Sequence, residues 1–181
     1  MIAISLGILA IAVANSLRTP LPQADDPTVD ANLPNFHKVN DRLYRGGQPK
    51  DDGFAELKKL GISTVIDLRE ADDNSAKEKA LAERAGLRFV NIPLDSWGRP
   101  GDQNIDRILD QINDPESQPV FVHCHRGSDR TGTVIAVYRI THDGWTGKQS
   151  SDEANKFGLG WWQVRMKDYI EDYYRDYRKD K

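Results

Sequence analysis

Cysteine is almost absent from this sequence, because Cys124 is the one thiol among its 181 residues. One cysteine cannot form an intramolecular disulfide bond, and it cannot supply a zinc site of the multi-cysteine kind. A surplus of either charge is also missing, since 25 Lys and Arg stand against 28 Asp and Glu. Such a chain is not drawn as a whole to nucleic acid or to an anionic membrane, so an anion-binding site has to be built locally.

The first apolar run is too short to span a membrane. It extends from Ile2 to Ala14, whereas a membrane-spanning helix needs roughly 20 apolar residues. The run ends in the A-x-A pattern of a signal-peptide cleavage site, although no Lys or Arg precedes it. We therefore expect residues 1–14 to be a signal peptide, and the mature protein to be periplasmic or secreted without stable membrane insertion. If the segment is not a signal peptide, a cytoplasmic protein is expected.

A linker is expected between this run and the folded domain. Residues 15–34 are polar and contain four prolines, a composition typical of linkers. The remaining residues, 35–181, are enough for one domain of ordinary size, and we expect that domain to be a monomer.

Strand-like and helix-like segments alternate along the domain. The apolar patterns predict strands over 63–68, 87–92 and 119–122, and helices over 54–60, 76–85, 104–113, 131–140, 150–157 and 161–177. The last helix is expected to cover the sheet with an apolar stripe of Trp161, Trp162, Met166, Ile170, Tyr173 and Tyr177. This alternation predicts an α/β fold in which helices flank a central, mostly parallel sheet.

The segment from His123 to Gly132 lies between an apolar strand and an apolar helix. A loop in this position directs backbone N–H groups into a concavity at the positive end of the helix dipole, where a tetrahedral oxyanion binds. Arg130 can offer its planar fork to two phosphate oxygens, and Cys124 then lies at the floor of the cradle as a nucleophilic thiolate. The expected phosphate-binding loop consists of His125, Arg126, Gly127, Ser128, Asp129 and Arg130.

This loop resembles the H-C-x5-R-[ST]-G loop of the cysteine-dependent protein tyrosine phosphatase superfamily. The segment Tyr44-Arg45-Gly46-Gly47-Gln48-Pro49 resembles the atypical dual-specificity branch of bacteria, plants and fungi. The resemblance extends over about Asn35 to Ile140. It implies a dual-specificity phosphatase-like fold, and a pocket shallower than that of the tyrosine-specific domains.

The same resemblance implies roles for individual residues. Cys124 would be the nucleophile, and Arg130 would bind phosphate and stabilise the transition state. The Thr131 hydroxyl would stabilise the thiolate when it departs from phosphorus, and His123 would orient the loop.

A general acid is also needed, because the leaving oxygen must be protonated as it departs. Asp95 is the first candidate, since it follows a predicted strand at about the family's usual distance before Cys124. Asp102 is the second, with a helix N-cap as its alternative role. Asp129 is the third, because myotubularin-like lipid phosphatases carry an aspartate beside the loop arginine. Its alternative role is to orient Arg130 or a loop amide.

We expect neither a metal nor a cofactor. His123, Cys124 and His125 are consecutive, so their side chains point to different sides of the strand end, and no second cysteine completes a metal site. Two other functions remain open. One is a phosphate-reading binding module without turnover, and the other is a rhodanese-like sulfurtransferase, against which Thr131 and Gly132 after the arginine argue.

The expected partner is a phosphorylated protein or a polyanionic phosphate ester. His125 and Arg126 directly follow the nucleophile and can project towards the rim of the pocket. Their local positive charge favours a substrate with more than one anionic group, such as a phosphoinositide or an inositol phosphate. The alternative is that both residues serve only the loop itself.

Overall fold

The computed structural model describes residues 31–179. Within this range five strands form a sheet in the order β1-β2-β5-β3-β4, in which β1 runs antiparallel to β2 and the other neighbours are parallel. The strands are β1 (His37–Asn40), β2 (Leu43–Gly46), β3 (Thr64–Asp67), β4 (Arg88–Asn91) and β5 (Val120–His123). The predicted α/β fold with a mostly parallel central sheet is therefore confirmed.

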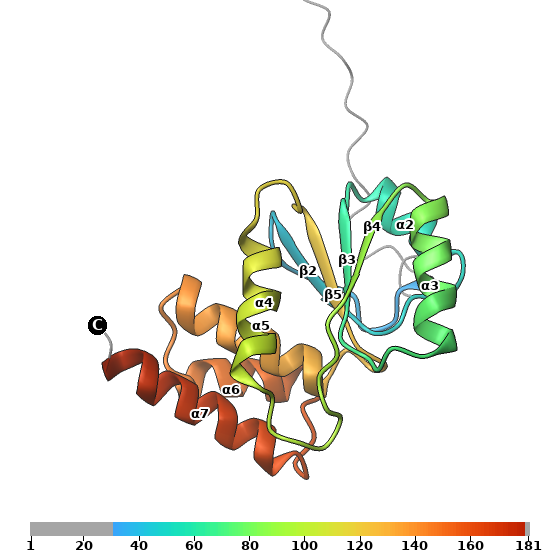
Figure 1. Cartoon of the computed structure of the whole chain (residues 1–181). Coiled ribbons are helices and arrows are strands. Elements are labelled where there is room, and N and C mark those ends of the chain that lie inside the picture. Colours follow the sequence, from blue (N-terminus) through green and yellow to red (C-terminus); the bar gives the residue numbers. More distant parts are fainter. Residues whose placement is uncertain (1–30, 180–181) are drawn as a thin grey trace, which may run out of the picture.

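Helices cover both faces of this sheet (Figure 1). One face carries α2 and α3, and the other carries α4 and α5, with α6 and α7 packed against α5. The helices are α2 (Gly53–Lys59), α3 (Asp73–Arg84), α4 (Asp102–Asn113), α5 (Asp129–His142), α6 (Gly147–Lys156) and α7 (Val164–Lys179). None of the helices between residues 31 and 179 is long and apolar enough to cross a membrane.

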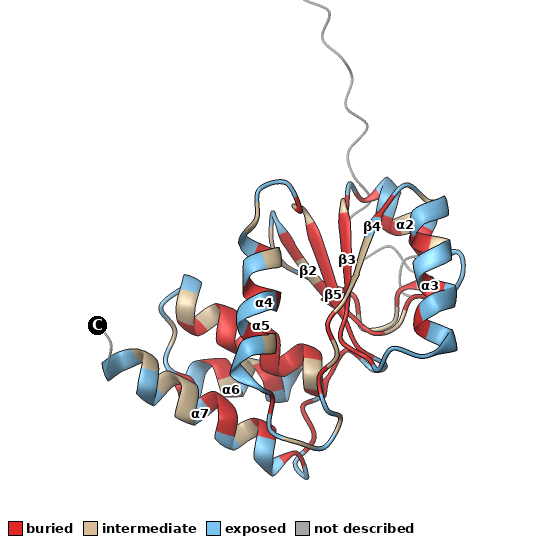
Figure 2. Cartoon of the chain, viewed as in Figure 1, coloured by how far each residue is buried: buried red, intermediate tan, exposed pale blue. Residues whose placement is uncertain are grey.

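The sheet divides the core into two layers, because successive strand side chains point to opposite faces. Val65 and Phe121 pack with the helix residue Phe54 on the α2 and α3 side. Ile66 and Val122 belong to the larger cluster on the α4 and α5 side. Figure 2 shows most residues of the central strands as buried, as expected for parallel strands covered by helices.

The structure differs from the expectation at the start of the domain. Leu33 is fully buried and the Asn32 carbonyl accepts a hydrogen bond from the Lys50 backbone, so the folded domain includes residues before Asn35. Strand β1 was not expected either, because its residues are largely polar and half-exposed at the sheet edge. The predicted signal peptide, residues 1–14, and most of the predicted linker lie outside the described residues, so both stay predictions.

The last helix also begins later than the pattern suggests. Trp161 and Trp162 precede α7 and are 82% and 43% exposed, so they do not cover the sheet. Met166 and Ile170, further along the same stripe, are buried, but they pack against α5 and α6 and not against the sheet, so the expected covering of the sheet is wrong. The apolar stripe of α7 therefore starts after the two tryptophans, which leaves their rings at the surface.

Candidate active site

The segment from Cys124 to Ser128 joins the carboxyl end of β5 to the first turn of α5. Strand β5 lies between β2 and β3 in the sheet, and all of its residues are buried. Helix α5 is buried along most of its length. The loop is therefore held by two rigid elements at the positive end of a 14-residue helix. The expected strand, loop and helix arrangement is present.

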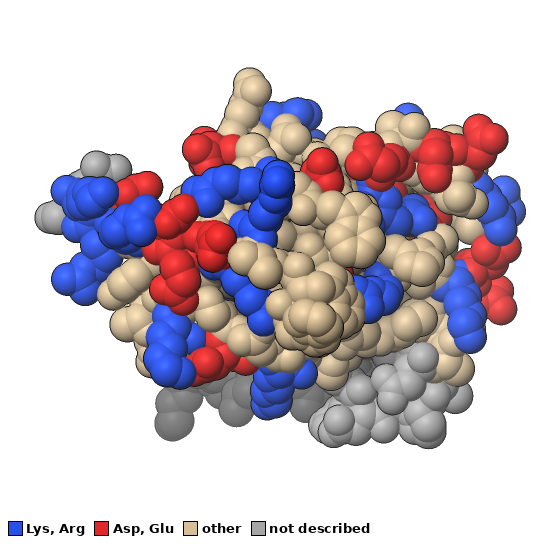
Figure 3. Space-filling model, turned by 90° about the horizontal axis from the view of Figure 1, so that it is seen from below, with Lys and Arg blue, Asp and Glu red and all other residues tan. Residues whose placement is uncertain are grey.

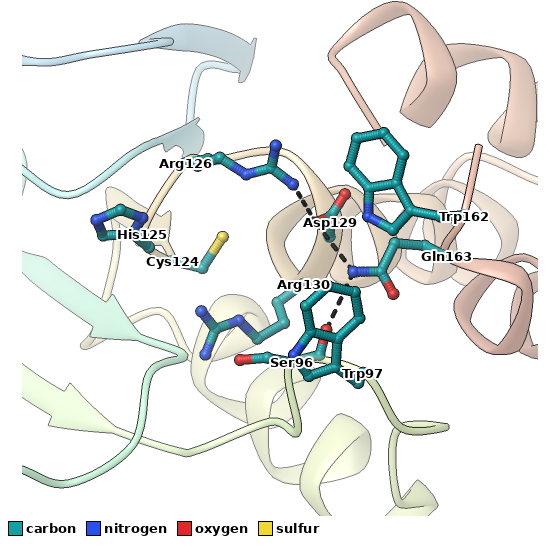
Figure 4. Close-up of a pocket in the computed structure, with 9 residues that line it drawn as sticks. All are labelled: Ser96, Trp97, Cys124, His125, Arg126, Asp129, Arg130, Trp162 and Gln163. Atoms are coloured by element: carbon teal, nitrogen blue, oxygen red, sulfur yellow. Dashed lines mark hydrogen bonds and ion pairs between the residues drawn. The ribbon is translucent and has the colours of Figure 1, made fainter. Parts of the chain in front are cut away.

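Cys124 and Arg130 face the same cavity, which has a volume of about 400 Å³. Figure 4 shows the Cys124 sulfur pointing into the space between the Arg126 and Arg130 side chains. The Arg130 Nη1 donates to the carbonyl oxygens of Leu68, at 3.3 Å, and Leu94, at 3.5 Å. These carbonyls follow β3 and β4, so the ends of two further strands hold the guanidinium beside the thiol.

Gly127 shows why the loop accepts no side chain at its middle. Its φ is +73°, a conformation that favours glycine, and an added Cβ would lie 2.4 Å from the Gly46 carbonyl carbon. The Gln48 N–H donates to the carbonyl of His125 at 3.1 Å. The segment from Tyr44 to Pro49 therefore supports the loop after β5 from behind. This close backbone approach explains why glycines stand at the contact between the two segments.

His123 lies below the loop in a buried charged cluster. Its Nδ1 is 3.4 Å from the Cys124 carbonyl oxygen, and its Nε2 is 3.4 Å from a Glu78 carboxylate oxygen. Burial lowers the pKa of His123 to about 4, although the Asp67 charge raises it. Burial also raises the pKa of Glu78 to about 7, against the nearby Arg69 charge. Between about pH 4 and pH 7 one proton is therefore held on Glu78 next to a neutral imidazole.

The ligand atoms of Asp67, Glu78 and His123 all lie within 4.8 Å of one another, a spacing that could hold a metal ion. However, Arg69 already pairs with both carboxylates, at 2.9 Å from Asp67 and 2.8 Å from Glu78. A divalent cation would have to displace or oppose this buried guanidinium. The donor set therefore fits an internal ion-pair cluster better than a metal site.

The three candidate acids occupy different surroundings. The exposed Asp95 accepts hydrogen bonds at Oδ1 from the backbone N–H groups of Trp97 and Gly98, both at 2.7 Å. These bonds hold the pKa of Asp95 below its usual value, and the Arg165 and Arg130 charges lower it further. Within the described part of the chain, its Oδ2 accepts no hydrogen bond.

Asp102 and Asp129 are each committed to structural contacts. Asp102, the first residue of α4, accepts a hydrogen bond from the Tyr169 hydroxyl at 2.8 Å and lines a different cavity. Gly101 and not Asp102 is the N-cap of that helix. Asp129 pairs with Arg126 at 2.5 Å and accepts from Gly160 N–H and the Gln163 side chain, at 2.9 and 3.1 Å.

The other loop residues divide between the rim and the interior. His125 and Arg126 are exposed at the rim, where the guanidinium carbon of Arg126 lies 5.7 Å from the Trp162 ring centroid. Ser128 is the N-cap of α5 and is nearly buried. Thr131 is fully buried, and its hydroxyl has no hydrogen-bond partner among residues 31–179.

The structure adds four wall residues that sequence reasoning missed. They are Ser96, Trp97, Trp162 and Gln163. Trp97 is 71% exposed. The Gln163 side chain donates hydrogen bonds to the Ser96 carbonyl and the Asp129 carboxylate, and so connects opposite sides of the cavity. Figure 3 views the molecule from below Figure 1, the side of the strand carboxyl ends, and shows uncharged atoms at the centre with residues of both charges around them.

Comparison with known proteins identifies similar chains. Residues 28–165 match the family described as "DSP-PTPase phosphatase fused to NAD+ Kinase". The dual specificity protein phosphatase TpbA of Pseudomonas aeruginosa is 31% identical over 156 residues, which are 85% of this chain and 66% of that protein. The chain thus spans just under two thirds of TpbA. The inositol diphosphatase DSP3 of Arabidopsis thaliana is 28% identical and covers 82% of this chain and 75% of its own length.

Solved structures give the same picture. The crystal structure of P. aeruginosa TpbA superposes with a TM-score of 0.67 at 28% identity, covering 86% of this chain and 92% of that one. A TpbA structure in complex with phosphotyrosine gives 0.68 at 26% identity and covers 91% and 99% of the two chains. The catalytic domain of SIW14 from Saccharomyces cerevisiae, at 22% identity, gives 0.69 over 81% and 89% and supports the fold alone.

Proposed function

Because this chain belongs to the DSP-PTPase family of phosphatases, we propose that it hydrolyses phosphate monoesters through a phosphocysteine intermediate. The observation that carries the proposal is the position of Cys124. Its thiol lies at the floor of a cavity formed at the start of α5, next to an Arg130 guanidinium held by two strand-end carbonyls. Backbone amides, a helix dipole and a bidentate cation favour a bound phosphate dianion and a thiolate nucleophile.

The proposed reaction has two steps. In the first, the Cys124 sulfur forms a bond to phosphorus while the bond from phosphorus to the leaving oxygen breaks, and a general acid protonates that oxygen. Arg130 stabilises the charge on the equatorial oxygens. In the second, a water oxygen attacks phosphorus after losing a proton to the same acid, and the sulfur departs as a thiolate. The partnerless Thr131 hydroxyl is then available as a donor to this thiolate.

Asp95 is the general acid that fits best among the three candidates. Asp102 is bound to Tyr169 in another cavity, and the Asp129 carboxylate already accepts from several donors. Asp95 does not line the cavity itself, but it keeps one carboxylate oxygen without a hydrogen bond and directly precedes the wall residues Ser96 and Trp97 in the chain. A small rearrangement of this loop that breaks the bonds from the Trp97 and Gly98 amides would return the pKa of Asp95 towards its usual value.

For the substrate we favour an aryl phosphate such as phosphotyrosine. Trp97 and Trp162 offer flat apolar surfaces at the mouth of the cavity, against which an aromatic leaving group can pack. Arg126, which would attract a second phosphate, is already paired with Asp129. This pairing reduces the advantage of a polyanionic ester, although the related DSP3 is named an inositol diphosphatase.

The experiment is phosphate release from a panel containing a phosphotyrosine peptide, a phosphoserine peptide, a phosphoinositide and an inositol polyphosphate. The wild-type protein should release phosphate from the tyrosine peptide at an unchanged rate in EDTA. Acid quenching with a 32P-labelled substrate should trap one label per chain on Cys124. Turnover that survives Cys124→Ser, that requires a metal, or that gives no trapped label would contradict the mechanism. A sulfurtransferase would instead transfer sulfur from thiosulfate to cyanide.

A further inference from the structure

Arg45 is a buried cation behind the phosphate loop. It is the third residue of β2, pairs in register with Val122 of β5, and is 1% exposed. Leu43, two residues earlier, belongs to the core on the α5 side, so Arg45 points to the same side of the sheet. Its Nη2 donates to the Gly127 carbonyl at 2.8 Å, and its guanidinium carbon lies 4.4 Å from the Phe157 ring centroid.

This guanidinium has no carboxylate of its own. Its Nε and Nη1 lack hydrogen-bond partners, and within residues 31–179 no carboxylate oxygen comes within 4.0 Å of it. The charge of Glu153 raises the pKa of Arg45. However, the Glu153 carboxylate already accepts hydrogen bonds from Nε and Nη2 of Arg139, at 3.1 and 2.8 Å. Arg139 therefore satisfies that carboxylate, and Arg45 is left with one hydrogen bond to a neutral carbonyl.

A buried unpaired charge is unfavourable unless a compensating charge lies nearby. Burial lowers the pKa of Arg45 to about 10, while the charges of Glu153 and Cys124 raise it. The guanidinium therefore stays charged at neutral pH. The fold keeps this charge buried, so another group must offset its cost.

The candidate is the Cys124 thiolate, because the two negative charges that act on Arg45 are those of Glu153 and Cys124, and Glu153 is already bound by Arg139. Arg45 touches the loop at Gly127, and its Nη2 lies close to the first turn of α5, 3.8 Å from where a Cβ on Gly132 would be. We propose that Arg45 is a positioning residue whose buried charge acts as the counter-ion of the Cys124 thiolate from behind the loop. The proposal rests on the proposed function, because it concerns the ionisation of the same nucleophile. It assigns a role to an arginine that touches no substrate.

Other charges also face this thiol and must stay constant in any test. Arg130 lies in front of it, and His125 with the Arg126–Asp129 pair lies at the rim. Below it is the cluster of His123, Glu78, Asp67 and Arg69, and beside α5 is the pair of Arg139 and Glu153. Variants of Arg45 leave all of these side chains in place, so a change in thiol ionisation reports on Arg45.

The test is the pH dependence of Cys124 alkylation by iodoacetamide, read by mass spectrometry on the full chain. Cys124 is the one cysteine in the sequence, so the reaction reports on a single thiol. Arg45→Met and Arg45→Gln remove the charge, Arg45→Lys keeps it, and Phe157→Leu removes the ring that the guanidinium packs against. Folding of each variant is checked by circular dichroism.

We expect the alkylation midpoint to rise by about one pH unit or more in the two neutral variants. It should move by less than half a unit in Arg45→Lys and Phe157→Leu. An unchanged midpoint in a folded neutral variant would show that Arg45 only supports the Gly127 carbonyl. If neither neutral variant folds, a rise of a full unit in Arg45→Lys overturns the proposal and an unchanged midpoint supports it. A wild-type midpoint as high as that of a free thiol would instead contradict the proposed function.

Discussion

The Glu78 carboxylate lies 3.4 Å from Nε2 of His123, and both side chains are buried beneath the phosphate loop. Burial raises the pKa of Glu78 from 4.5 to about 7 and lowers the pKa of His123 from 6.5 to about 4. Between pH 4.5 and 6.5 the proton of this pair lies on His123 in the unfolded chain and on Glu78 in the folded protein. Folding therefore moves a proton within the pair, with little net uptake or release.

The two shifts have opposite effects on stability. A carboxyl with a raised folded pKa binds its proton more tightly in the folded state, so its contribution is lost as pH rises from 4.5 through 7. A histidine with a lowered folded pKa releases its proton on folding, so its contribution is lost as pH falls from 6.5 through 4. In the wild type these slopes cancel between pH 4.5 and 6.5.

Glu78→Gln should remove this cancellation. We expect its free energy of unfolding to decrease relative to wild type as pH falls from 6.5 to 4.5, by up to about 1.4 kcal/mol per pH unit. Urea unfolding at several pH values measures the free energy of unfolding of both proteins. The contributions of the other carboxylates are the same in both, so they cancel in the difference. Glu83→Gln, at an exposed position of the same helix, is the matched control and should follow the wild type. Parallel stability curves for Glu78→Gln and wild type would contradict the proton transfer.

Substitution of the nucleophile and the loop arginine should separate binding from catalysis. Cys124→Ser should reduce turnover below about a thousandth of wild type, since serine forms no thiolate, while phosphate still binds the amide cradle. Arg130→Lys should reduce kcat/KM by about 10² to 10³, because an ammonium cannot make the bidentate contact. Steady-state kinetics and isothermal titration with inorganic phosphate measure both effects. Loss of phosphate affinity in Cys124→Ser would show instead that the substitution disrupts the loop.

The close approach of two backbone segments predicts a large effect of Gly127→Ala. The new Cβ would lie 2.4 Å from the Gly46 backbone, in addition to the strain of φ at +73°. We expect a loss of about 2 kcal/mol or more in unfolding free energy, together with most of the activity. Gly144→Ala is the control, because its φ is +71° and no atom lies within 4 Å of its Cβ. It should cost only the strain, about 1 kcal/mol. Equal losses in both variants would rule out an effect of the contact with Gly46.

The strand, loop and helix around Cys124 and the central elements could be predicted because their signals are local. An apolar strand, a loop with Cys124 and Arg130 at fixed spacing, and an apolar helix are adjacent in the sequence, and the structure keeps them adjacent. Strand β1 gave no such signal, because an edge strand with half-exposed polar residues lacks apolar alternation. Leu33 was assigned to the linker because its burial depends on contacts made by distant parts of the chain.

The supporting charges could not be predicted, because their partners come from separate elements. Arg45 meets Gly127 across 82 positions, and Glu78 meets His123 between α3 and β5. In the sequence each is an ordinary charged residue, for which an exposed position is the usual expectation. The motif from Tyr44 to Pro49 indicated a family, but its role as the support of the loop follows only from the fold.

A general acid at Asp95 predicts a dependence on the leaving group. Asp95→Asn should slow aryl phosphates with poor leaving groups by about 10², and those with good leaving groups by only a few fold, since a good leaving group departs without a proton. The limb of the pH profile on which activity falls as this acid deprotonates should also flatten. Asp102→Asn, whose carboxylate binds Tyr169, is the control and should show no such selectivity. The assignment fails if Asp102→Asn or Asp129→Asn reproduces the effect and Asp95→Asn does not.

The exposed ring of Trp97 in the cavity wall predicts different effects on KM for aromatic and non-aromatic substrates. Trp97→Leu should raise KM for a phosphotyrosine peptide about tenfold and leave KM for an inositol polyphosphate nearly unchanged, because an aromatic ring loses its packing surface. Trp161→Leu is the matched control, since this ring is 82% exposed and does not line the cavity.

Alanine at both His125 and Arg126 should give the opposite pattern at low salt, with a higher KM for the inositol polyphosphate and little change for the peptide. Because Arg126 pairs with Asp129, we expect this charge effect to be smaller than the effect of Trp97, and to disappear in high salt. Steady-state kinetics of both substrates at two salt concentrations provide the comparison. If the double variant changes KM for the inositol polyphosphate more than Trp97→Leu changes KM for the peptide, then rim charge and not aromatic packing selects the substrate.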